Sequence, residues 1–223
     1  MEYVWPVVVV SLKVALCATA AVMCCSLLLA NILAFSRSKL LKALEIAIYL
    51  PMAMPPVALG YGLLLIFGHD AWLGVLLHRL GIEVAFNFLG AVLAAFLVSL
   101  GIGVRTLRQA LSEIDAEQRQ VAKLLGARPW QIYLFIELPQ CKGAIISATV
   151  LVFIRALSEF GATIVLAGNS LGSTRTLALA IWVGMETPGR ERECLVFLLI
   201  AALVSVVAIT LSEMALKTRR PRR

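Results

Sequence analysis

The feature of this sequence that most limits its fold is a series of long apolar runs that lack the alternation of a half-buried strand. A bilayer core about 30 Å thick needs about 20 mainly apolar residues per helix, and only helices and closed barrels satisfy their backbone groups in lipid. Runs without alternation favour helices. The composition agrees, because 61% of the 223 residues are apolar and 15% are charged, against roughly 45–50% and 25% in soluble domains. We therefore predict an all-α integral membrane protein.

Five apolar runs of spanning length predict five transmembrane helices in a single domain, 1–223. These runs are Pro6–Ala34, Leu44–Phe67, Val84–Val104, Gly143–Leu166 and Leu195–Leu216. The residues before the first run carry no positive cluster, so we interpret this run as a retained span and not as a signal peptide. The second run contains Pro51, Pro55 and Pro56. Because proline removes a backbone donor, we predict a kinked or broken helix there, with a loop before a shorter span as the alternative.

The basic residues indicate how the chain is oriented in the membrane. Lys and Arg are concentrated after the first span, between the third and fourth spans, and in the tail after Leu216. Since cytoplasmic connections carry an excess of these residues, we predict a cytoplasmic C-terminus and an external N-terminus. The net charge of +7 then reports orientation, and nucleic acid is not expected as a partner. On the outer side, residues 176–185 are apolar but too few to span, which predicts a re-entrant or interfacial segment.

The connection between the third and fourth spans, residues 105–142, is too long for a turn and predicts two short helices. An acidic first turn predicts a helix over 115–125, and Gly126 is expected to stop it. A second helix is predicted over 130–137, and Pro139 is expected to help end it. The two helices would present an exposed apolar knob with basic residues around it. Such a knob fits a groove on a partner protein.

The same connection resembles the EAA signature of ABC importer permeases, whose pattern is E-A-A, three residues, G, nine residues and I-x-L-P. The chain has Gln120 in place of the glutamate and Val121 in place of the first alanine, and it otherwise matches the pattern. Gln120 keeps the size and hydrogen bonding of the glutamate but not its charge. The resemblance implies a coupling helix that docks into a nucleotide-binding subunit. The predicted docking residues are Gln120, Val121, Ala122, Leu125, Gly126, Ile136, Leu138 and Pro139.

Further runs resemble the molybdate-type permeases, whose close relatives handle sulfate and tungstate. These runs are 50–61, 90–94, 155–163, 167–169 and 176–182, with Ser158 and Ala178 as departures. The resemblance implies a type I importer fold in a bacterial or archaeal plasma or inner membrane, acting as a homodimer surrounded by lipid. It also implies two ATP-binding cassette subunits that bind ATP and Mg, and an external oxyanion-binding protein. The implied substrate is molybdate, with sulfate and tungstate as alternatives.

Two opposite charges lie within the fourth apolar run. Arg155 and Glu159 are spaced i and i+4, so they share a helical face and can pair. Intramembrane charges are costly and usually face a bundle interior or an aqueous path. One hypothesis is that this pair lines the translocation pathway together with Pro55 and Pro56, with Arg155 attracting the oxyanion. The other is a structural ion pair that packs two permease copies together, and the sequence leaves both open.

The sequence offers no machinery for covalent chemistry. It has no GxxxxGK(S/T) phosphate loop, so ATP must be bound by another subunit. His69 and Asp70 are adjacent and rarely point at a common substrate, and the cysteines show no CxxC spacing. We therefore predict a transport subunit that is not an enzyme and that binds no metal or cofactor itself. A membrane scaffold without transport is the alternative from a different class.

Overall fold

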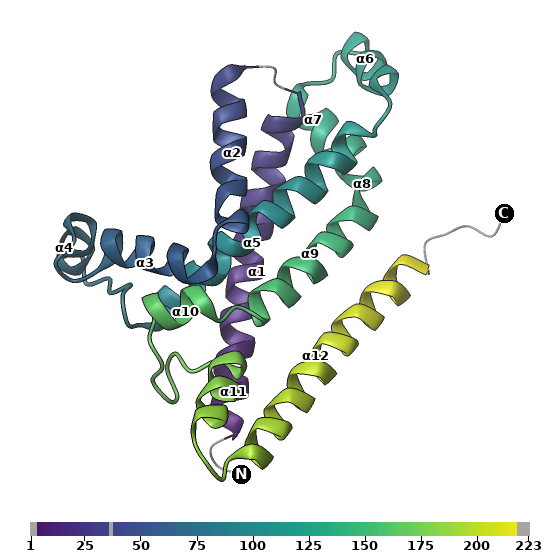
Figure 1. Ribbon diagram of the computed structural model, residues 1–223. Helices are drawn as coiled ribbons and strands as arrows, with labels where there is room; N and C mark the ends of the chain where they lie inside the picture. The colour runs from purple at the N-terminus through teal and green to yellow at the C-terminus, as the bar shows by residue number, and fades with distance from the viewer. Residues whose placement is uncertain (1–3, 36–37, 218–223) are drawn as a thin grey trace.

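The structure, a computed structural model, describes residues 4–35 and 38–217. Every regular element in these ranges is a helix, which confirms the all-helical prediction (Figure 1). Three helices are long and apolar enough to cross a membrane alone: α1 (Val4–Phe35), α5 (Phe88–Ser112) and α12 (Glu191–Lys217). Two bent helix pairs raise the number to five if each pair counts as one span. The chain therefore has three to five membrane spans within its described part.

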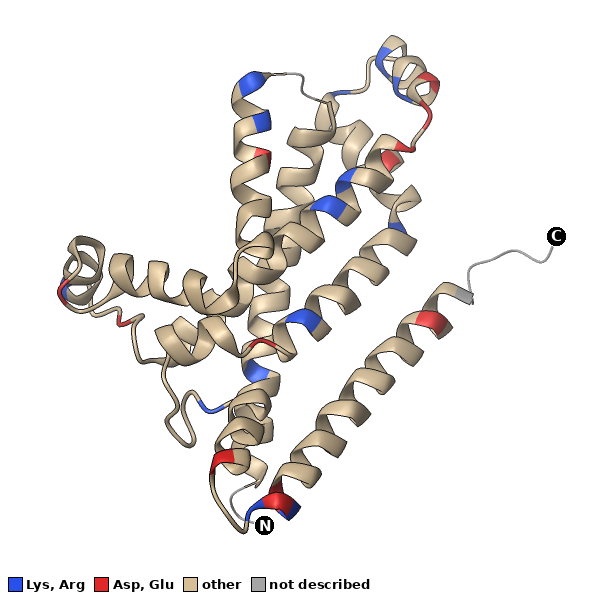
Figure 2. Cartoon of the chain, in the orientation of Figure 1, with Lys and Arg blue, Asp and Glu red and all other residues tan. Residues whose placement is uncertain are grey.

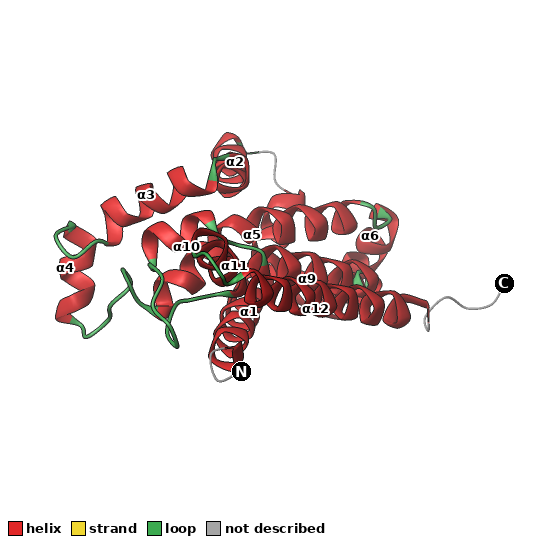
Figure 3. Cartoon of the chain, turned by 60° about the horizontal axis from the view of Figure 1, so that its bottom comes forward, coloured by secondary structure: helices red, strands yellow, loops and turns green. Residues whose placement is uncertain are grey.

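The second predicted span is a broken helix. α2 (Lys39–Ala53) and α3 (Pro56–Phe67) meet at an angle of 117°. Pro51 is accommodated inside α2, whereas Pro56 opens α3, where a missing N–H leaves no hydrogen bond unmade. α4 (Trp72–Arg79) follows at the outer end of α3, away from the central helices (Figure 3), whereas α3 itself packs on residues 161–166. The run therefore forms two helices with a sharp bend at Met54 and Pro55.

The prediction of one continuous helix over 143–166 is wrong. α9 (Lys142–Leu157) ends before Ser158, and α10 (Gly161–Leu166) begins after a gap of three residues. Glu159, the residue before the N-cap Phe160, stabilises the new start, because its Oε1 accepts the free backbone N–H of Ala162 in the first turn of α10 at 2.8 Å. α9 forms a bent spanning pair with the helical segment Pro129–Gln140, and the bend of 75° lies at the start of α9.

Four short helices connect α5 to α9 at the top of Figure 1. They are α6 (Ala116–Leu124), α7 (Pro129–Ile132), the π-helical η1 (Tyr133–Glu137) and α8 (Leu138–Gln140). The prediction that Pro139 ends the second helix is wrong, because the chain stays helical to Gln140. Pro139 lies in the first turn of α8, where proline is tolerated, and the bend falls at Cys141.

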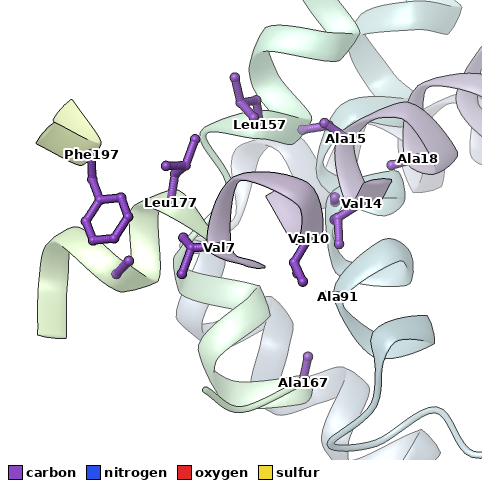
Figure 4. Close-up of a cluster of buried hydrophobic side chains, with 13 residues drawn as sticks. Val7, Val10, Val14, Ala15, Ala18, Ala91, Leu157, Ala167, Leu177 and Phe197 are labelled. Carbon is purple, nitrogen blue, oxygen red and sulfur yellow. The ribbon is translucent and has the colours of Figure 1, made fainter. Parts of the chain in front are cut away.

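The core of the molecule is the contact of α1 with α5 and α9. Ala15 and Ala18 of α1 and Ala91 of α5 are fully buried in it (Figure 4). Gly103 of α5 lies so close to α1 that a Cβ there would stand 2.5 Å from the Oγ of Ser26. Lipid gives helices no hydrophobic reason to associate, so close packing of small residues holds them together.

The last two helices lie at the edge of this core. α11 (Leu177–Glu186) corresponds to the predicted short apolar segment. Ser11 of α1 fixes its start: the hydroxyl donates to the carbonyl of Val7 at 2.7 Å and accepts the N–H of Leu177 at 2.7 Å. α12 packs on α11 through the buried Phe197 and runs beside α9 (Figure 3). Only 6% of its apolar window is buried, so most of its surface has no contact within the chain.

Candidate functional site

The turn between α6 and α7 is fixed by local hydrogen bonds. The side chain of Asp115 accepts the N–H of Glu117 at 2.9 Å and caps the start of α6. Gly126, with φ of +85°, adopts the left-handed conformation that commonly ends a helix. The N–H of Ala127 then donates to the carbonyl of Ala122 at 3.0 Å. The chain therefore reverses at Gly126 as the sequence predicts, and α6 ends within one residue of its predicted limit.

The tip of this turn exposes large apolar side chains. Leu124 is 87% exposed, Leu125 is 83% exposed and Val121 is 55% exposed. These three residues lie on one side of α6 and are called the apolar knob below. Trp130 and Phe135, on the returning segment, are also exposed. Clustered apolar exposure of this kind marks an interaction surface.

The structure divides the predicted docking residues into two groups. The exposed group, at the tip of the turn, is Gln120, Val121, Leu125 and Gly126. Ala122 is buried beneath them, with 7% of its surface exposed. The other group lies on η1 and α8, where Ile136 and Leu138 are partly buried and Pro139 is exposed. The tip can contact a partner directly, and the second group belongs to the segment that supports it.

An ion pair that the sequence analysis missed ties α6 to this supporting segment. Arg119 of α6 donates through Nε to Oε1 of Glu137 at 2.6 Å, and its Nη2 contacts the same oxygen. Glu137 is only 3% exposed. The guanidinium carbon of Arg119 also lies 3.2 Å from the centre of the Phe35 ring at the end of α1. One arginine therefore joins α6, η1 and α1, and a second link runs from Gln140 to Gln118 at 2.8 Å.

The two helix breaks meet each other in the interior. A Cβ on Gly161, the first residue of α10, would stand 2.9 Å from the Cβ of Pro56. One turn further along α3, a Cβ on Gly60 would stand 2.8 Å from both the Cα and the carbonyl oxygen of Ala162. Such close backbone approach is open only to glycine. The α2–α3 break and the α9–α10 break therefore form one junction.

The charges of the fourth run lie at this junction. Nη1 of Arg155 is 2.9 Å from Oε2 of Glu159, which is 2% exposed. Because Oε1 of the same carboxylate caps α10, both oxygens of Glu159 are occupied within the chain. Glu159 lies two residues before Gly161, which packs against Pro56, so the Arg155–Glu159 pair stands beside this junction. Within one copy the pair connects the end of α9 to the start of α10.

Within residues 4–35 and 38–217, no three His, Cys, Asp or Glu side chains are grouped closely enough to hold a metal ion.

Residues 24–222 match the family described as the binding-protein-dependent transport system inner membrane component. The chain belongs to this family. It is 38% identical to the molybdenum transport system permease protein ModB of Escherichia coli K12 over 180 residues, which are 80% of this chain and 79% of that protein. The ModB protein of Haemophilus influenzae is 37% identical over 74% of this chain and 73% of its own length. Sulfate permease 2 of Chlamydomonas reinhardtii is 35% identical, over 69% of this chain and 42% of that protein.

Solved structures of ABC transporters share the fold. A bacterial alginate ABC transporter, in complex with its alginate pentasaccharide-bound periplasmic protein, matches all of this chain and 82% of its own with a TM-score of 0.80 at 16% identity. An amino acid ABC transporter matches 93% of this chain with a TM-score of 0.64 at 18% identity. The predicted importer permease fold and family are thereby confirmed. The chain is a multi-pass translocation subunit of an ABC transporter and not a catalyst.

Proposed function

We propose that this chain is the membrane-spanning permease of an ATP-driven molybdate importer. The observation that carries the proposal is the extent of its similarity to molybdenum transport system permeases, which covers about four fifths of both chains. The sulfate permease of the alga is similar over less than half of its own length. Sulfate import is therefore the second candidate, and tungstate, as an oxyanion of the same form, would follow the molybdate path.

We place the α6–α8 segment in the cytoplasm, the N-terminus outside and the C-terminus inside. Basic residues gather at the start of α2, on the last turns of α5 and on α6, all at the same end of the molecule (Figure 2). An excess of Lys and Arg is the general mark of cytoplasmic connections. Leu124→Cys, in a background without native cysteines, is expected to react with an impermeant thiol reagent in inverted vesicles and not in intact cells. Reaction in intact cells would reverse the proposed orientation.

In this orientation the apolar knob faces a cytoplasmic ATPase subunit. Two such subunits, carrying the ATP and Mg, would each hold one knob of a permease homodimer, and a binding protein outside would deliver the oxyanion. The exposure of Leu124 and Leu125 supports a partner at the knob. The family description and the periplasmic protein in the alginate transporter complex support the external partner.

Closure of the ATPase subunits would move α6, and the ion pair between Arg119 and Glu137 would pass this movement to η1 and the end of α1. α9 would carry it from the bend at Cys141 to the junction with α3. The transporter would then alternate between an outward-open and an inward-open state, each favoured by a different ligand. Arg155 and Glu159 serve this change by keeping the junction intact.

The test is transport by the reconstituted complex. The permease, its ATPase subunit and its binding protein are placed in liposomes, and ATP-dependent uptake of radiolabelled molybdate and sulfate is measured in parallel. We expect uptake of molybdate, and ATP hydrolysis stimulated by the molybdate-loaded binding protein. Uptake of sulfate alone would establish the second candidate. Neither uptake nor anion-stimulated hydrolysis by an intact complex would indicate a scaffold without transport.

A further inference from the structure

A polar cleft lies where the end of α5 and the start of α9 meet the short helices that connect them. Its volume is about 530 Å³. Its polar lining comes from Glu113 and Asp115 between α5 and α6, Gln118 of α6 and Gln140 of α8, and Gly143 of α9 lies on its wall. The amide of Gln140 donates to the side-chain oxygen of Gln118 at 2.8 Å. The cleft is therefore built from the same segment that carries the apolar knob.

The acidic side chains of this cleft have no basic partner. Glu113 and Asp115 are exposed, and neither forms an ion pair within residues 4–35 and 38–217. The carboxylate of Glu113 accepts the side-chain amide of Gln109 at 3.2 Å, and that of Asp115 accepts the N–H of Glu117 at 2.9 Å. Both donors are neutral, so the two negative charges stay unbalanced. In the described chain these carboxylates belong to no group of three ligands that could hold a metal ion, which leaves a larger cation as their complement.

The last helix of the described chain ends against a wall of this cleft. A Cβ on Gly143 would stand 3.4 Å from Cδ2 of Leu216, one residue before α12 ends at Lys217. The chain continues with residues 218–223, Thr-Arg-Arg-Pro-Arg-Arg, which carry four arginines. A strongly basic segment therefore starts beside two carboxylates that lack a cation.

The length of this segment is sufficient to cross the cleft. An extended chain covers about 3.3–3.6 Å per residue, so the six residues after Lys217 reach up to about 20 Å. Because Gly143 itself lines the cleft, the segment needs to cross only the width of the cleft to meet Glu113 and Asp115. The anionic surface of the membrane is the other place where a basic segment can bind. The unbalanced carboxylates next to the end of α12 favour the cleft.

We propose that the arginines of residues 218–223 bind in this cleft of their own chain, against Glu113 and Asp115. A guanidinium presents a planar fork of donors that matches a carboxylate. The contact ties the end of α12, a helix with few contacts in the chain, to the turn that starts α6. The last span then follows α6 when the apolar knob moves. This contact does not depend on which anion the transporter carries.

The experiment is disulfide cross-linking in the intact complex of permease and ATPase subunits, held in nanodiscs. Gln118→Cys and Pro221→Cys are combined in a background without native cysteines, so that every charge of the cleft and of the basic segment is kept. We expect a disulfide within one chain, which leaves a monomer band on a non-reducing gel and is identified by mass spectrometry of the linked peptides. The control pair is Lys39→Cys with Pro221→Cys, because the start of α2 lies apart from α12 (Figures 1 and 3). This pair is expected not to link.

The dependence on charge separates a specific contact from chance collision. Glu113→Gln with Asp115→Asn removes both charges, and asparagine retains the cap on α6. We expect this change to slow cross-linking about fivefold, as for the loss of two exposed ion pairs. Glu117→Gln removes an exposed charge of the same helix outside the cleft and is expected to leave the rate unchanged. Size-exclusion chromatography verifies that each variant forms the complex.

The competing sites are the membrane surface and a second copy of the chain. Cross-linking that is equally fast in nanodiscs of zwitterionic and of anionic lipid supports the cleft. Loss of the cross-link in anionic lipid would assign the basic segment to lipid headgroups and overturn the proposal. A cross-linked dimer in place of the monomer, or an unchanged rate after Glu113→Gln with Asp115→Asn, would also overturn it. Failed molybdate uptake by the unaltered complex would refute the proposed function alone, because the cross-link is measured without transport.

Discussion

The ion pair between Arg119 and Glu137 gives the sharpest test of how the α6 region is held. Arg119→Met removes the cation and leaves a carboxylate that is 3% exposed. An unpaired buried charge of this kind costs about 3–5 kcal/mol. Glu137→Met costs less, because the side chain of Arg119 is 22% exposed and can turn towards water. The double variant replaces the pair with apolar side chains and is expected to lose about 2 kcal/mol or less. The coupling energy between the two positions, the sum of the two single costs less the cost of the double variant, is then at least about 1 kcal/mol plus the cost of Glu137→Met.

The free energy of unfolding is measured for the four proteins of this cycle by SDS titration in detergent micelles, followed by circular dichroism. The matched control is a second cycle on Arg190 and Glu193, an exposed pair 3.8 Å apart. Exposed pairs contribute about 1 kcal/mol or less. A coupling energy for Arg119 and Glu137 no larger than that of the control would refute the argument that burial makes this pair strong.

The same variants separate stability from transport. If the pair only stabilises the fold, the double variant, which regains most of the stability, also regains uptake. We expect instead that its complex hydrolyses ATP normally while molybdate uptake falls at least threefold, because two apolar side chains do not fix the angle between α6 and η1. Full recovery of uptake per ATP hydrolysed would show that the pair has no part in coupling.

Three further substitutions test the knob, the junction and the buried charges. Gly126→Glu is expected to abolish co-purification with the ATPase subunit. The control Gly172→Glu has the same positive φ in an open loop, so it causes the same backbone strain of about 1 kcal/mol but is expected to leave docking intact. Gly161→Ala, whose Cβ would stand 2.9 Å from Pro56, is expected to lower the free energy of unfolding by about 1–3 kcal/mol and to reduce uptake, while Gly62→Ala, with open space around it, does neither. Arg155→Gln is expected to lower the free energy of unfolding by about 3 kcal/mol, and the double variant with Glu159→Gln is expected to regain at least half of this loss. Unchanged stability of the single variant would contradict the structural role of the pair. Lost uptake in a stable double variant would indicate the pathway role.

The elements that the sequence predicts well are those whose cause is local. α1, α5 and α12 follow from the length of their apolar runs, and α6 follows from the acidic residues of its first turn and a glycine at 126. The break between α2 and α3 is indicated in the sequence by the prolines at 55 and 56. In each case the signal and the structure lie within a few residues of one another.

The break between α9 and α10 has no such signal, because its cause lies in another part of the chain. Gly161 is a single glycine in an apolar run, and only the position of Pro56, 105 residues earlier, shows why a side chain is excluded there. Glu159 could be predicted to pair with Arg155 but not to cap a new helix. Arg119 pairs with Glu137 and Arg108 pairs with Glu45 because of how the helices pack. The sequence does not show which of the basic residues in this connection form ion pairs.

The contacts that were missed from the sequence are also the ones that connect the distant parts of the molecule. α6 is joined to η1 and α1 at Arg119, and the helical path continues through a bend at Cys141 into α9. Two residues after the end of α9, the carboxylate of Glu159 holds the start of α10. α9 has 16 residues and is therefore about 24 Å long. In the proposed transport cycle a helix of that length would act as a rigid lever between the bend at Cys141 and the junction with α3. Under the proposed function, displacement of the apolar knob would reach the packing of α10 on α3 along this path, so we expect a change at Gly161 to alter transport while ATPase docking stays intact.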